Sequence, residues 1–296
     1  MPNALELARR YKENKLTANH AYLVYGETKT GKTALLGTIA KLPECKRLFF
    51  FDLENGVSTI FNPDVGLTDE ELSKIEIISI EDTKQRPSAI LTVGKALTNA
   101  EGASICEKHG RESCPDCLKA KLPLIKFKLS DLGPGDWVVI DSGSQLGESA
   151  LNFVTKDRPV EYKLSFNDYG DAGRLLHNIF STVQQATHCK FVVATHTIDI
   201  GEGEDGTKNV KTYPWVGTRN FSKNVGKYFG TVIFTDKKLN KHIAGSSSTY
   251  SPRVLTGSRL GLRFEDLKEV SFLELLGSKT GTEPKPATKL GLKKSL

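Results

Sequence analysis

One stretch of the sequence decides the fold: Gly26-Glu27-Thr28-Lys29-Thr30-Gly31-Lys32-Thr33, which Ala34 follows. It fits the pattern G-x-x-x-x-G-K-[ST] at every fixed position, and an apolar run (21–25) precedes it. In this pattern, glycines let backbone N–H groups curl around phosphates, the lysine reaches the β- and γ-phosphate oxygens, and the final hydroxyl binds Mg²⁺. The segment 32–41 predicts a helix whose positive dipole end faces the same phosphates. A chance match is the alternative, but a strand before the loop and a helix after it are the context that such a loop requires.

A second apolar run, Trp137-Val138-Val139-Ile140-Asp141, predicts a buried parallel strand that ends in a carboxylate. Many buried strands end in Asp, so this run alone is a weak signal. Together with a phosphate loop upstream, it predicts that Asp141 and Thr33 hold Mg²⁺, with Asp141 acting directly or through water.

The length of 296 residues and the hydrophobic content of 38% predict one substantial core with small appendages. We divide the chain into an N-terminal helix within 1–19, a core domain over 20–276 with an insertion at 101–120, and a tail over 277–296. No run approaches the ~20 apolar residues of a membrane span, and the first ten residues lack an apolar signal core. We therefore expect a soluble, cytoplasmic protein without a membrane partner.

The formal charge of +6 is concentrated at the C-terminus, because residues 278–296 contain five lysines against the single acid Glu283. The remainder is nearly balanced, so any binding of a polynucleotide must come from local patches or from this tail. The tail has no aromatic residue and contains Pro284 and Pro286, which is typical of a disordered segment. It is either a solubilising terminus or a contact for DNA or a partner.

Three of the five cysteines lie close together with one histidine, as Cys106-x2-His109-x4-Cys114-x2-Cys117. An odd cysteine count without a secretion signal argues against a disulfide framework. Four sulfur or imidazole ligands within one short loop predict a tetrahedral, closed and therefore structural Zn²⁺ site. The alternative is a surface insertion without metal.

The remaining periodicity predicts strands that alternate with helices, and hence an α/β fold with a mainly parallel sheet covered on both faces. Ligands of such sheets bind at the carboxyl ends of the strands, where Glu54, Asp141 and His196 all fall. The predicted strands are 47–54, 74–80, 190–196, 230–235 and 242–246, and the predicted helices are 4–15, 88–98, 147–155, 170–186 and 264–276.

The order of these motifs resembles the RecA superfamily over residues 20–275, and more narrowly the phage-encoded RecA-like ATPases of single-strand annealing and recombination. The resemblance implies a RecA-like P-loop core, ATP and Mg²⁺ as cofactors, and the cytoplasm of a bacterial host. It implies that Glu54, in Phe51-Asp52-Leu53-Glu54, activates the attacking water. It also implies that His196 senses the γ-phosphate, although the amide usual at that place in the family is absent. A capping or salt-bridged carboxylate and a structural strand-end histidine are the alternatives for these two residues.

Two segments are candidates for contact with single-stranded DNA, because cations follow phosphates while aromatic rings stack on bases. The first matches the place of the first DNA-facing loop of the family, and a solvated turn is its alternative. The second follows an acidic, glycine-rich segment (199–206) that we expect to be mobile, and its alternative is that Tyr213-Pro214-Trp215 folds back as an apolar patch. The candidate contacts are Lys156, Arg158 and Lys163 in the first segment, and Lys208, Lys211, Tyr213, Trp215 and Arg219 in the second.

These observations favour an ATP- and Mg²⁺-dependent, DNA-stimulated ATPase that promotes annealing or strand exchange. The resemblance also implies a homo-oligomer, either a ring or a filament, whose adjoining subunit supplies a cation from among Lys237, Lys238, Arg253 and Arg259. A single-stranded-DNA-binding protein is a further candidate partner. One alternative function is a nucleotide-regulated interaction protein of phage replication or packaging that hydrolyses slowly. Another is a phosphotransferase for a small acceptor, since a phosphate loop alone does not separate ATPases from kinases.

Overall fold

The computed structural model describes residues 4–6, 9, 21–159, 161–202, 209–238, 241–246 and 253–259. Several predicted features lie wholly or largely outside these residues. They are the rest of the N-terminal helix, Lys208, the helix 264–276 and the tail 277–296.

The core is a sheet whose order is β11-β10-β1-β7-β6-β2-β3, with β12 also pairing with β10. All pairs from β10 to β3 are parallel, and β11 and β12 pair with β10 in the antiparallel sense. This arrangement confirms the predicted mainly parallel sheet. The strands are β1 (Ala21–Gly26), β2 (Arg47–Asp52), β3 (Ile75–Ser79), β6 (Asp136–Asp141), β7 (Lys190–Thr195), β10 (Thr231–Lys238), β11 (Lys241–Gly245) and β12 (Gly257–Ser258).

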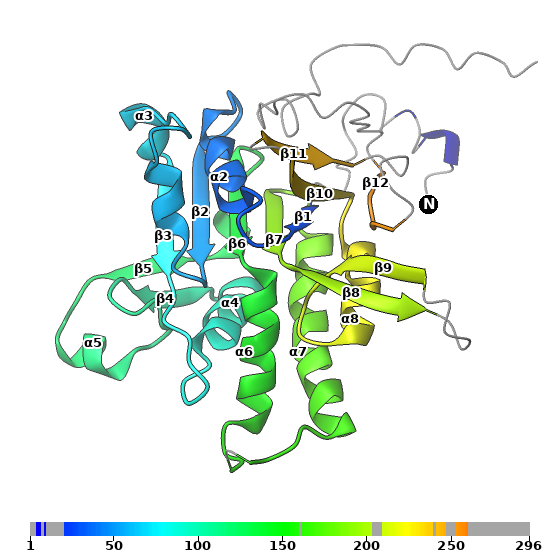
Figure 1. Cartoon of the computed structure of the whole chain (residues 1–296). Helices are drawn as coiled ribbons and strands as arrows, with labels where there is room; N and C mark the ends of the chain where they lie inside the picture. The colour runs from blue at the N-terminus through cyan, green and yellow to red at the C-terminus, as the bar shows by residue number, and fades with distance from the viewer. Residues whose placement is uncertain are drawn as a thin grey trace, which may run out of the picture.

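Helices cover both faces of the sheet because successive strand residues point to opposite sides. Leu23, Phe51 and Val193 pack toward α4 (Ser88–Thr98), α6 (Gly143–Thr155) and α7 (Phe166–Gln185), which lie together on one side of the sheet in Figure 1. Val24 and Phe50 pack toward α2 (Lys32–Gly37) on the opposite side. The short elements are α3 (Asp69–Leu72), α8 (Arg219–Asn224) and the 3-10 turns Thr38–Lys41, Val57–Phe61, Leu129–Asp131 and Val225–Tyr228.

Two regions are more regular than the sequence predicted. Residues 199–202 of the segment that we expect to be mobile belong to an antiparallel hairpin of β8 (Thr197–Glu202) and β9 (Asn209–Pro214). The cysteine insertion is built on a second hairpin, β4 (Ala103–Cys106) and β5 (Leu124–Phe127), together with α5 (Pro115–Lys119). The insertion therefore extends beyond residue 120, and Figure 1 shows it projecting at the β3 edge of the sheet.

Helix boundaries also differ from the predictions. The predicted helix 32–41 becomes a 3-10 turn after Gly37, while α6 and α7 each begin four residues before the predicted start. Ser142 and Ser165 cap these two helices by accepting the N–H groups of Gln145 and Asp168, so the early starts have a local cause. Within the described part of the chain, no helix has the length and apolarity needed to cross a membrane.

The start of β6 is fixed to β2 by an ion pair, in which Arg47 donates to both oxygens of Asp136 at 2.9 and 2.7 Å. Burial raises the pKa of Asp136, but the hydrogen bonds from Arg47 and from the Gly133 N–H lower it by a larger amount. The net pKa therefore lies below its ordinary value. A lowered carboxyl pKa contributes stability above the unfolded-state value near 4, and this contribution is lost as the pH falls through the folded-state value.

We predict that Asp136→Asn lowers the free energy of unfolding by about 1–3 kcal/mol at pH 7, because a bidentate charged pair loses one partner. Urea denaturation at pH 7 and below pH 4 measures the effect, and the difference from wild type should shrink at the lower pH. Glu44→Gln is the matched control, since Glu44 forms a single, more exposed contact of 3.3 Å with Lys190. Equal losses for the two variants would contradict the prediction.

Candidate nucleotide site and metal module

The phosphate loop connects β1 to α2, as its sequence predicted. A Cβ on Gly26 would lie 2.1 Å from Thr235 Oγ1, so only glycine fits where the loop leaves the sheet against β10. Gly31 has φ of 89°, which glycine adopts without strain. Thr30 Oγ1 donates to the Glu27 carbonyl at 2.8 Å and lies 2.9 Å from Thr235 Oγ1. These contacts hold the loop in a curled shape that suits a phosphate chain.

Lys32 and Thr33 start α2 and point back toward the loop and toward β6. Lys32 Nζ donates to the carbonyls of Gly26 at 2.9 Å and Glu27 at 2.7 Å, and burial lowers its pKa despite the opposing charges of Asp141 and Glu54. The Thr33 hydroxyl donates to Asp141 Oδ2 at 2.7 Å. Two hard oxygen ligands therefore lie side by side next to a buried ammonium group, and this donor set fits Mg²⁺ on a triphosphate.

Asp141 is buried at the end of β6, between β2 and β7. Burial raises its pKa to about 6, and the charges of Glu54 and Asp52 add to this effect while the Thr33 hydrogen bond and Lys32 oppose it. The peptide bond from Asp141 to Ser142 is cis.

Glu54 and His196 also meet here, from the ends of β2 and β7. His196 Nε2 lies 3.0 and 3.1 Å from the two Glu54 oxygens, and the Ser142 hydroxyl donates to Oε1 of the same carboxylate. Burial raises the Glu54 pKa, but the hydrogen bonds from His196 and Ser142 and the charge of Lys32 outweigh it, so the net pKa is lowered. Glu54 is therefore an ionised hydrogen-bond acceptor at neutral pH. The second ring nitrogen of His196, Nδ1, is buried without a hydrogen-bond partner among the described residues.

The backbone of His196 is tied to the base of the β8–β9 hairpin. The Trp215 N–H donates to the His196 carbonyl at 2.8 Å, while Ser144 Oγ accepts the His196 N–H at 2.8 Å and donates to the Trp215 carbonyl at 2.7 Å. His196 thus contacts the Glu54 carboxylate through its side chain and the predicted DNA-facing segment through its backbone.

The sequence reasoning missed several residues of this site. Ser142 and Ser144 lie within three residues of Asp141, and a serine at the first turn after a carboxylate-ending strand was the available signal. Asp52 is buried and accepts the N–H groups of Gly56 at 3.0 Å and Val57 at 3.2 Å, which shapes the turn after Glu54. His242 of β11 lies against Gly31, and no local pattern indicated that contact.

The Cys106, His109, Cys114 and Cys117 ligand atoms all lie within 4.8 Å of one another. His109 Nδ1 lies 4.0, 3.6 and 3.3 Å from the sulfurs of Cys106, Cys114 and Cys117. Zinc–ligand bonds of about 2.0–2.3 Å separate tetrahedral ligands by roughly 3.5–4 Å. Three thiols and an imidazole at these separations fit a structural Zn²⁺ site.

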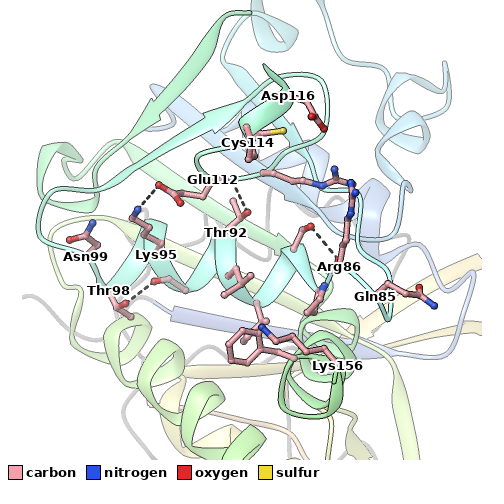
Figure 2. Close-up of a pocket in the computed structure, with 18 residues that line it drawn as sticks. Gln85, Arg86, Thr92, Lys95, Thr98, Asn99, Glu112, Cys114, Asp116 and Lys156 are labelled. Carbon is pink, nitrogen blue, oxygen red and sulfur yellow. Dashed lines mark hydrogen bonds and ion pairs between the residues drawn. The ribbon is translucent and has the colours of Figure 1, made fainter. Parts of the chain in front are cut away.

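This metal module, residues 103–127, is docked on the core at the end of β3. The Glu81 N–H donates to the His109 carbonyl at 3.1 Å, Arg111 pairs with Glu81 at 2.9 Å, and a Cβ on Gly110 would lie 2.1 Å from the Ser79 carbonyl oxygen. Figure 2 shows the other side of the junction, where Glu112 pairs with Lys95 of α4 at 2.5 Å and its N–H donates to Thr92 at 3.2 Å. A cavity of about 860 Å³ lies between α4 and the module.

The predicted DNA contacts have different environments. Lys156, Arg158, Lys163, Lys211 and Arg219 are exposed. Lys156 lies over the ring of Phe153 at 5.0 Å, and Arg158 lies over Tyr162 at 5.2 Å. Trp215 is partly buried, and the Tyr213 side chain is only 9% exposed, which favours the fold-back alternative for Tyr213.

No family model matches the chain, and no curated protein matches it. Among solved structures, a prototypical ATPase from the type III secretion system of pathogenic bacteria has 12% identity and a TM-score of 0.44, and the match covers 82% of this chain. The chain spans 57% of the length of that ATPase. The RadB recombinase has 16% identity and a TM-score of 0.37, with coverage of 77% of this chain and 80% of its own. The sheet topology and the phosphate loop described above define an α/β fold with a mainly parallel sheet and a P-loop.

We predict that Asp141→Asn removes a pH dependence of stability in metal-free buffer. A raised carboxyl pKa stabilises the fold below the unfolded-state value near 4, and this contribution is lost as the pH rises through about 6. The wild-type free energy of unfolding should therefore fall by roughly 2–3 kcal/mol more than that of the variant between pH 4 and pH 7. Urea denaturation with EDTA measures it, and Asp64→Asn, at an exposed acid, should keep the wild-type slope. A wild-type slope for Asp141→Asn would contradict the prediction.

Proposed function

We propose that the protein is an ATP- and Mg²⁺-dependent ATPase of RecA type that binds single-stranded DNA and is stimulated by it. The observation that carries this proposal is the convergence of Glu54, Asp141 and His196, from three neighbouring strand ends, on the phosphate loop. A loop of this kind grips a triphosphate, and carboxylates beside it supply the metal contact and the activation of water.

Each residue has a role that its contacts support. The loop amides and Lys32 bind the phosphates, and Thr33 and Asp141 would hold Mg²⁺, which neutralises charge that develops on the phosphate oxygens. Glu54 is ionised, so it can orient water or accept a proton from it. His196 keeps the Glu54 carboxylate in position, and its backbone passes changes at this carboxylate to the segment at Trp215.

Single-stranded DNA is the proposed partner because exposed cations follow both α6 and the β8–β9 hairpin. Hydrolysis would change the contacts of Glu54 and thereby the position of the hairpin base, a switch of the kind that resets a ligand-holding state. The biological output that fits this behaviour is annealing or strand exchange in phage recombination, carried out by a homo-oligomer on DNA.

We predict that Lys32→Ala lowers ATP hydrolysis at least about 100-fold, because a charged donor to the transferred phosphate is lost. Phosphate release with and without single-stranded DNA measures it, and the wild-type rate should rise on addition of DNA. Lys46→Ala, at an exposed lysine outside the loop, is the control. Hydrolysis that DNA leaves unchanged would favour a nucleotide-regulated interaction protein, and ADP formation that requires a small acceptor would favour a phosphotransferase.

We also propose that the metal module holds one structural Zn²⁺ through Cys106, His109, Cys114 and Cys117. The support is the separation of the four ligand atoms and the closed set of four ligands, which leaves no position for a reactive water. The buried cluster around the four ligands consists of the three cysteines with Leu124 packed against them, whereas Ala103, Ile105 and Phe127 of the module are buried in the main core.

We predict that the purified protein contains one equivalent of zinc and that Cys114→Ser lowers this content to near zero. Because metal binding and folding are coupled, the variant should also expose the module to limited proteolysis. Metal analysis by mass spectrometry and mapping of the proteolytic fragments measure the two effects. Cys45→Ala, at a buried cysteine outside the cluster, should retain the full zinc content. Full zinc content in Cys114→Ser would refute the site.

A further inference from the structure

A cavity of about 930 Å³ separates one face of α7 from the segment that runs from Trp215 through α8 to Tyr228. We call it the aromatic groove, after its lining rings Phe166, Tyr169, Trp215, Phe221 and Tyr228. Figure 1 shows α7 and α8 side by side, with the β8–β9 hairpin next to them. None of the α7 residues in the groove was a predicted site residue.

On the α7 side of the groove, aromatic side chains are exposed to solvent and do not contribute to the buried core. Phe166, at the first position of α7, is 93% exposed, and Tyr169 one turn later is 40% exposed. Gly170 and Gly173 lie on the same helix face, and a Cβ added to either would meet no atom within 4 Å. Glycine inside a helix destabilises it relative to alanine. Packing within the chain therefore does not require glycine at either position.

The charges of the groove select the occupant. Its described lining contains the cations Arg174, Arg219 and Lys227 and no carboxylate. Arg174 pairs with Asp171 on the adjacent turn of α7, and Lys227 lies over the Tyr228 ring at 4.9 Å. Rings interleaved with cations, with no carboxylate in the lining itself, fit a flexible polyanion that carries aromatic groups. Single-stranded DNA has this chemistry, because its bases stack on rings and its phosphates contact cations.

We propose that the aromatic groove binds single-stranded DNA by stacking bases on Phe166 and Tyr169 while Arg174, Arg219 and Lys227 contact phosphates. The proposal rests on the proposed function, since it deepens the binding of the same polynucleotide. It adds residues of α7 and the turn after α8 to the DNA-binding surface. Trp215 lines the groove and is hydrogen-bonded to His196, which in turn contacts Glu54. Binding of a base in the groove is therefore connected to the Glu54 carboxylate through these two residues.

Fluorescence anisotropy with a labelled oligo-dT of about 20 nucleotides tests the proposal, alongside an abasic oligonucleotide of equal length. The Phe166→Ala/Tyr169→Ala double variant should weaken binding of oligo-dT by at least about 30-fold, since each lost stacking contact is worth about 1–3 kcal/mol. It should bind the abasic strand like the wild type, because the phosphate contacts remain. Gly173→Leu adds an apolar side chain at a wall position where a Cβ meets no atom within 4 Å, and it improves helix propensity, so it should fold and also bind oligo-dT more weakly. Phe61→Ala, at an exposed phenylalanine outside the groove, is the matched control and should bind like the wild type.

Tryptophan emission gives a second measurement, since Trp215 lines the groove and the other tryptophan, Trp137, is fully buried. Oligo-dT should quench the emission, and the abasic strand should quench it less. Wild-type affinity in both the double variant and Gly173→Leu would overturn the groove while leaving DNA binding by the protein intact. Loss of self-association instead of DNA affinity would overturn it in favour of a second copy of the chain. A wild-type protein that binds neither strand would overturn the DNA-binding function itself, and the groove with it.

Discussion

The buried carboxylate of Asp141 is the constraint on which the candidate site depends. It lies between β2 and β7, its pKa is raised to about 6, and Thr33 is its direct hydrogen-bond donor in α2. Asp52 and Glu54 add negative charge at the same sheet edge, and Lys32 is the nearby cation. A buried negative charge without enough neighbouring positive charge lowers the stability of the fold. A divalent cation bound here would therefore stabilise the fold as well as hold the nucleotide.

The same edge of the sheet determines how the nucleotide site reaches the rest of the molecule. Oε1 of Glu54 accepts from both Ser142 and His196, so any water or phosphate that engages this oxygen competes with one of the two. Ser142 is the N-cap of α6, and His196 is hydrogen-bonded to Trp215 at the hairpin base. A change in the contacts of Glu54 can therefore affect two regions. One is α6, which precedes the first cationic loop, and the other is Trp215 in the wall of the aromatic groove.

Hydrophobic periodicity and sequence motifs were sufficient to predict those parts of the fold that depend on local sequence or on fully buried strands. The phosphate loop, the strands β1, β2, β6 and β7, and the meeting of Glu54, Asp141 and His196 followed from apolar runs that end in polar residues. The β8–β9 hairpin did not, because pairing of Ile198 with Tyr213 depends on a partner strand rather than on composition. The early start of α7 was readable, since Ser165 and Asp168 form a capping box. The groove was not readable, because its two walls are about 50 residues apart in the sequence.

The metal module is anchored to the core both by the apolar side chains of its hairpin and by contacts at the end of β3. β3 is the last strand of the sheet, and an edge strand presents backbone groups that can pair with another chain. The module contacts the end of this strand through the His109 carbonyl and the close approach of Gly110 to Ser79. His109 belongs to the cluster that would bind zinc, so one residue carries both the metal contact and the docking contact. Metal binding would therefore fix the position of His109 at the end of β3, and loss of metal would loosen this docking contact.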